Sequence, residues 1–166
     1  RSSPSARVGS VPRMANFVFN IAKGRVAEFF NRVDSNDPAN SAIILVPCSA
    51  SDTEANAQDA DTLTAALATA INEQSSGGWS RKTLTDADLS AIAVDDTNNR
   101  MPATLPQVTW TGPTVGNDTT GLLICYDGDT TGGTDANIVP LVHCDFAVTA
   151  DGNDVILQTG DCFRAS

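Results

Sequence analysis

Few residues of this 166-residue chain have side chains that could do chemistry, and the first is its single histidine, His143, beside Cys144. A thiol next to an imidazole can form a nucleophile with its base. The two residues, however, lie in an alternating run (IVPLVHCDFAV), where neighbouring side chains point to opposite faces of a sheet. The pattern therefore predicts a partly buried strand histidine. No serine-hydrolase elbow, phosphate-binding loop or dinucleotide fingerprint is present, and the protein is predicted not to be an enzyme.

Metal binding is the second chemistry to consider. The segment DGDTTG at residues 127–132 matches positions 1, 3, 5 and 6 of a calcium loop, and Asp135 falls at position 9. Position 12 should be a bidentate glutamate and is Ile138, and the segment follows a predicted strand. The favoured interpretation is a solvated turn, and no cofactor is predicted. Asp127, Asp129 and Asp135 are the residues that a weakly bound calcium or magnesium ion would use.

The cysteines number four, which permits two disulfides in three connectivities. They lie far apart and inside apolar runs, and no export signal is visible in residues 1–13. These features favour buried, reduced thiols, with disulfides as the alternative. The four are Cys48, Cys125, Cys144 and Cys162.

Charge is distributed unevenly along the chain. Residues 1–33 carry six basic residues and one acid, whereas residues 34–166 carry four basic residues and nineteen acids. The net charge of −10 argues against nucleic acid as a partner, and no apolar run is long enough to span a membrane. A basic head on an acidic body suits contact between copies or docking on an acidic neighbour. The alternative is that the basic head is a flexible tail or an expression remnant before a natural start at Met14.

The front half of the chain mixes strand and helix patterns. Residues 15–21 alternate as a strand does, with Phe17 and Phe19 on one face. Residues 25–33 place Val26, Phe29, Phe30 and Val33 on one helix face, and a short helix is favoured there; the alternative is a hairpin turn at residues 23–24 followed by a second strand. Further along, we expect a buried strand at 42–46 ended by Pro47, a helix at 59–71, a strand at 79–84, one or two helical turns at 85–92 and a polar loop at 95–106.

The back half has the pattern of β structure. Short apolar runs at 107–111, 122–126, 138–148 and 154–158 are separated by turn residues, and residues 150–153 are predicted to form a hairpin turn. We therefore predict an α+β fold, mainly β: an antiparallel sheet or barrel-like sandwich with one or two short helices. Residues 1–22 would form an extended N-terminal arm and residues 23–166 a single compact domain.

Several segments resemble a known group of proteins: MANFVFNIAKGRVAEFFNRV with SNDPANSAIILV, then LTDADLSAI, DDTNNR and ICYDGDTTGGTDANIVPLVHCDFAVT. Together they are similar to small proteins encoded among the virion structural genes of tailed bacteriophages. The likeness covers nearly everything from Met14 onward but contains no functional motif. It implies a virion component assembled in the bacterial cytoplasm and transfers no catalytic residues.

Within that group, the expected role is capsid decoration: a cement protein that binds the assembled head shell, by fold-level analogy. Its partners would be the major capsid protein or other virion subunits, and it would form a homo-oligomer. Alternatives are a tail, connector or fibre-associated subunit, and a carbohydrate- or host-surface-binding β module that stacks a sugar on Trp110, although Trp110 lies in a core-like run. The predicted partner contacts are Arg7, Arg13, Phe17, Phe19 and Arg25, whereas Phe29 and Phe30 are more typical of the core.

Overall fold

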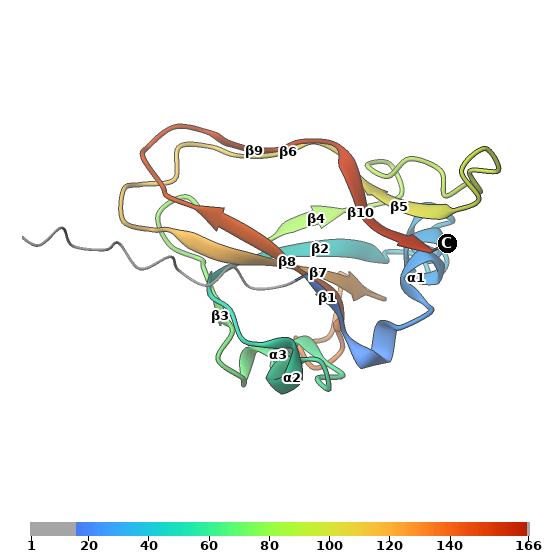
Figure 1. Ribbon diagram of the computed structural model, residues 1–166, viewed down its shortest axis with the longest axis horizontal. Helices are drawn as coiled ribbons and strands as arrows, with labels where there is room; N and C mark the ends of the chain where they lie inside the picture. Colours follow the sequence, from blue (N-terminus) through green and yellow to red (C-terminus); the bar gives the residue numbers. More distant parts are fainter. Residues whose placement is uncertain (1–15, 166) are drawn as a thin grey trace, which may run out of the picture.

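A computed structural model describes residues 16–165 and has a mainly β, α+β architecture (Figure 1). One antiparallel sheet has the strand order β1-β8-β7-β2-β3, and β4 pairs with β2 beside β3. Two further antiparallel pairs, β5–β10 and β6–β9, stand apart from it. The elements are β1 (Phe17–Val18), a 3₁₀ turn η1 (Asn20–Ala22), α1 (Val26–Asp34), β2 (Ala42–Ala50), α2 (Glu54–Ala57), α3 (Leu63–Leu67), β3 (Asn72–Glu73), β4 (Lys82–Leu84), β5 (Met101–Leu105), β6 (Val108–Trp110), β7 (Thr119–Asp127), β8 (Val139–Val148), β9 (Val155–Leu157) and β10 (Gly160–Ala165).

The central sheet is covered on both faces, which explains its continuous apolar strands. Along β2, Ile43 and Leu45 face one core, which is covered by α1 and the two outer strand pairs. Ile44 and Val46 face a second core, which is covered by α2 and α3. Figure 1 shows the outer pairs and these two helices on opposite sides of the sheet. Strands that are buried on both faces lose the polar alternation of a half-exposed sheet.

Pro47 does not end β2, contrary to the expectation from the sequence, because β2 changes partner at this residue. Its Leu45 pairs with Lys82 of β4, and Cys48 pairs with Glu73 of β3. The Pro47 carbonyl accepts a hydrogen bond from the Gln74 N–H at 2.8 Å on that side of β2. The missing proline N–H points to the same side, at the seam between two partner strands, so no ladder bond to β7 is lost.

The N-terminal residues that the structure describes belong to the body of the fold, not to an arm. Phe17 is 5% exposed, and Phe19 and Ala22 are fully buried. The Phe19 N–H donates to the Leu141 carbonyl at 3.0 Å, and the Asn20 N–H donates to the Gln58 carbonyl at 2.8 Å. The predicted boundary at residue 22 is therefore wrong, and residues 1–15 lie outside the described part of the chain.

Helix α1 confirms the predicted helix at residues 25–33, but the predicted helix at 59–71 shortens to α3, with α2 as a separate turn before it. Local polar groups end α3. The Thr69 hydroxyl donates to the Ala66 carbonyl at 2.7 Å, and Asp52 accepts the Ala70 N–H at 3.0 Å. These bonds take the backbone groups that another helical turn would have paired.

Of the one or two helical turns expected at 85–92, the structure has one: the Leu89 N–H donates to the Thr85 carbonyl at 3.2 Å, and Asp88 accepts the Thr85 N–H at 2.9 Å. Two further expectations need correction. The polar loop expected at 95–106 contains β5, whose Ala103 and Leu105 are buried. Residues 150–153 form a turn but not a hairpin, because β9 pairs with β6 and not with β8. Among residues 16–165, no helix is both long and apolar enough to cross a membrane.

Candidate functional site

His143 lies in β8 and is fully buried. Its Nε2 lies 3.1 Å from the Ser51 hydroxyl oxygen, and its ring stacks on Phe17 with 5.0 Å between ring centroids. Cys144, the next residue, packs against the core on the other face of the sheet. The prediction that these two side chains diverge is confirmed, so they form no nucleophile–base pair.

The structure instead brings His143 against Ser51, which sequence reasoning missed. Ser51 follows β2, and its hydroxyl also lies 3.0 Å from the Thr120 hydroxyl of β7. Gly121 makes the contact possible, since a Cβ at this position would lie 2.5 Å from Ser51 Oγ and 2.6 Å from His143 Nε2. A glycine inside an otherwise apolar strand is the one local signal that another group approaches closely.

A serine hydroxyl on an imidazole nitrogen is the pairing that a nucleophile and its base would use. Here the ring is buried between Phe17 and the Gly121 backbone, and Ser51 bridges the end of β2 to β7 and β8. This arrangement holds the first strand, β1, on the edge of the sheet. We assign the cluster of Ser51, Thr120 and His143 a positioning role in the fold.

Gly121→Ala is expected to lower the free energy of unfolding by about 1–3 kcal/mol, because the new methyl group must displace Ser51 and His143. Gly128→Ala is the matched control: it lies just past the same strand, and its Cβ would meet nothing closer than 3.6 Å. Urea unfolding of both variants measures the difference. Equal midpoints for Gly121→Ala and the wild type would contradict the close packing described for this cluster.

The three carboxylates of the calcium-like loop do not all converge: Asp127 and Asp129 line one hollow of about 360 Å³, and Asp135 is not part of its lining. Asp127 accepts the Asp129 N–H at 3.0 Å, and Asp129 accepts the Thr131 N–H at 3.0 Å, so both form local turns. Asp135 is bound by two Arg81 nitrogens, at 2.6 and 2.8 Å. Within residues 16–165, no group of three histidine, cysteine or acidic side chains is arranged to hold a metal ion. The hydrogen bonds of Asp127 and Asp129 are those of a turn, as the sequence predicted for this segment.

Arg81 joins two acidic residues from distant segments. It contacts Glu73 at 2.6 Å and Asp135 at 2.6 Å, which ties β3 to the 128–138 connection. The hydrogen bonds from Arg81 hold the pKa of the Asp135 carboxyl below its ordinary value. A carboxyl with a lowered folded-state pKa stabilises the fold above its ordinary pKa and loses that contribution as the pH falls through the folded value.

Arg81→Met is therefore expected to cost about 1 kcal/mol at pH 7, since the side chains are partly exposed and screened by solvent. The difference from the wild type should shrink as the pH falls below about 4 and through the lowered folded-state pKa of Asp135, because the carboxyl takes up a proton over that range and its attraction to Arg81 is lost. Thermal unfolding at a series of pH values measures it. A difference that stays constant down to about pH 2 would show that Arg81 acts through packing alone.

Of the five predicted partner contacts, two lie outside the described residues, one is exposed and two are buried. Arg7 and Arg13 lie outside the described residues. Arg25, the residue before α1, is exposed but bound to Glu28 of that helix at 3.0 Å, and it also lies over the Phe29 ring. Phe17 and Phe19 fill the chain's own core, so the expectation that they anchor a partner is withdrawn.

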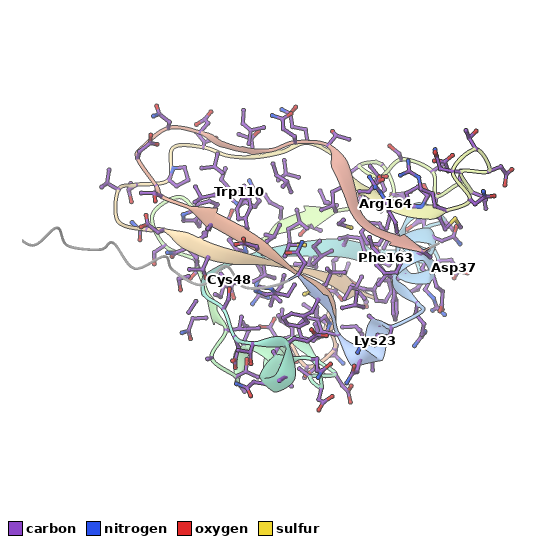
Figure 2. The ribbon with its side chains drawn as sticks, in the orientation of Figure 1. Lys23, Asp37, Cys48, Trp110, Phe163 and Arg164 are labelled. Atoms are coloured by element: carbon purple, nitrogen blue, oxygen red, sulfur yellow. The ribbon has the colours of Figure 1, made fainter. Side chains whose placement is uncertain are left out.

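Trp110 is fully buried, and its indole N–H donates to the Ser80 carbonyl at 2.9 Å. It therefore offers no face to a sugar, and the core interpretation is confirmed. Figure 2 places Trp110 beneath the β6–β9 pair. Phe29 and Phe30 are core residues of α1, as their helical spacing predicts.

Comparisons of this chain with protein-family models, with curated proteins and with solved structures find no match.

Proposed function

We propose that this protein is a non-enzymatic subunit of a tailed-phage virion, and that it decorates the head shell as a cement protein. The resemblance of the chain to small virion proteins supports the class. Binding only the assembled lattice would stabilise that lattice by mass action. Copies would cluster around a local symmetry axis of the shell, as a homo-oligomer.

The observation that carries the docking mode is the separation of charge along the chain. Residues 16–165 hold all twenty acidic residues and seven of the ten basic ones. Each of the five arginines among them contacts a carboxylate of the same chain, so these cations are already engaged within the body. The remaining three, Arg1, Arg7 and Arg13, precede the described residues. An acidic body and a basic segment on one chain suit docking on a surface of complementary charge.

The location of the protein in intact particles tests this proposal. Cryo-electron microscopy of the virion, or gold-labelled antibody against the chain, should place copies in regular clusters over the head. Copies confined to the tail, connector or fibres would overturn the cement role and establish the alternative subunit class. Absence of the chain from purified particles would contradict both the cement role and the alternative role in the tail, connector or fibres.

Charge-dependent docking predicts that affinity for shells falls roughly tenfold or more between about 50 and 200 mM salt. Replacing Arg7 and Arg13 by glutamate should weaken binding at low salt and flatten the salt dependence. Arg25→Gln is the matched control, because Arg25 is already paired with Glu28 and a smaller change is expected. Co-sedimentation with shells that lack the protein measures the affinity of the wild type, the double glutamate variant and Arg25→Gln. An affinity that does not vary with salt concentration would contradict an electrostatic role for these arginines in docking.

A further inference from the structure

Two thiols line one cavity on the strand-pair side of the central sheet. The cavity is about 210 Å³ and lies between β7 and β8 on one side and β5, β9 and β10 on the other. Its walls are mostly apolar, with Leu105, Leu122 and Phe146 among them. Cys144 enters it from β8 and Cys162 from β10. Strand β10 contacts β8 as well as pairing with β5, so the two cysteine-bearing strands are neighbours.

Both thiols are reduced in the structure and only partly buried. Burial raises the pKa of Cys144 to about 11 and that of Cys162 to about 12, and for Cys162 the neighbouring Cys144 adds to the effect. The Cys162 thiol donates to the Ala103 carbonyl at 3.2 Å. The two thiols are thus close enough to influence each other, remain protonated near neutral pH, and border a space that a small oxidant can approach.

We propose that Cys144 and Cys162 form a redox modification site, at which they join in a disulfide that ties the last strand, β10, to the central sheet.

The reaction is thiol–disulfide exchange with a small-molecule disulfide such as oxidised glutathione. One cysteine loses its proton, and its thiolate attacks one glutathione sulfur, which releases the other glutathione as a thiolate. The second cysteine, once deprotonated, attacks the protein sulfur of this mixed disulfide and releases the second glutathione. Two protein thiols are oxidised, one glutathione disulfide is reduced to two thiols, and the two protons pass to solvent and to the glutathione thiolates.

The other two cysteines provide an internal comparison. Cys48 and Cys125 are fully buried on the opposite, helix-covered face of the sheet. Burial raises the pKa of Cys48 to about 12, as it does that of Cys162, so the two pairs differ in exposure and not in acidity. An oxidant that reaches Cys144 and Cys162 in the folded protein should therefore leave Cys48 and Cys125 reduced. The specific content of the proposal is that one disulfide forms out of the six pairs that four cysteines allow.

Oxidation should raise the thermal midpoint by roughly 5–10 °C, because a cross-link between residues 144 and 162 restricts the unfolded chain. It should also proceed faster with pH, by about tenfold per unit between about pH 7 and 9, since the thiolate fraction is small throughout that range.

The experiment uses the isolated full chain, so its result is independent of the assignment to a particle. Protein is incubated with oxidised glutathione, remaining thiols are alkylated, and the chain is cut by a protease specific for aspartate, which separates all four cysteines. The expected product is one peptide pair joined through Cys144 and Cys162, with Cys48 and Cys125 alkylated only after unfolding.

Cys144→Ser and Cys162→Ser serve as controls, and neither should form the link or show the rise in midpoint. Four outcomes would each overturn the proposal in the wild-type chain alone: both thiols still free, a stable mixed disulfide that does not close, a bond to Cys48 or Cys125, or a link between two chains. Because these readouts use the wild type, the test still holds if a serine variant fails to fold.

Discussion

Replacing both Phe17 and Phe19 by alanine is expected to leave most of the protein unfolded at room temperature. The two side chains are 5% and 0% exposed, and their ring centroids lie 5.1 Å apart in the helix-covered core. Each buried phenylalanine-to-alanine change costs about 3–5 kcal/mol, although neighbouring sites are not strictly additive. Most of the folding stability, about 5–15 kcal/mol for an ordinary domain, would be lost. Circular dichroism with urea unfolding measures it.

Phe19→Leu is the control for this pair, because it keeps an apolar side chain of similar volume and should cost less than about 1.5 kcal/mol. A double alanine variant with an unchanged urea midpoint would return residues 17–22 to an arm outside the body, as the sequence alone suggested. It would also reopen Phe17 and Phe19 as partner contacts.

Trp110→Ala is expected to cost about 3–5 kcal/mol. The Trp110 ring lies 5.3 Å from that of Trp79 and 5.7 Å from that of Phe146, so its removal leaves a large cavity beneath the β6–β9 pair. It also leaves the Ser80 carbonyl without its indole donor. Fluorescence of Trp79 during urea unfolding reports the change, since Trp79 is the other tryptophan of the chain.

Trp110→Phe separates packing from the hydrogen bond: it restores most of the ring volume, and the remaining loss measures the bond to Ser80, about 1–2 kcal/mol. A Trp110→Ala protein of unchanged stability that had lost binding to a sugar would instead place this residue at the surface and revive the carbohydrate-binding alternative.

Sequence patterns predicted best those elements in which burial and periodicity agree. Helix α1 repeats its buried residues at helical spacing, and β7 and β8 are long apolar runs bounded by turn residues. The helix at 59–71 failed because Asp52, distant in sequence, captures a backbone N–H of this segment. β5 was missed because its pairing partner, β10, lies far along the chain, and no local pattern reports such a partner.

The same limit applies to the polar cluster. The separation of His143 from Cys144 follows from strand geometry alone and was predictable. The contact between His143 and Ser51 joins residues 92 positions apart. The only local indication of it was Gly121, a glycine inside an apolar strand, which indicates that another group approaches closely. The position of the Asp135 carboxylate likewise depends on a residue from another part of the chain, because Asp135 forms an ion pair with Arg81.

The strand order of the sheet also bears on how the chain is made. β1 pairs with β8, β5 with β10, and β6 with β9, so each pairing joins segments that are synthesised far apart in time. Folds dominated by such non-local pairing fold in milliseconds to seconds, not microseconds. Phe17 and Phe19 are made long before β8, which pairs with β1 and whose His143 stacks on Phe17. Until β8 has been made, the core around Phe17 lacks one of its covering strands, and apolar surface exposed in this way favours aggregation during folding.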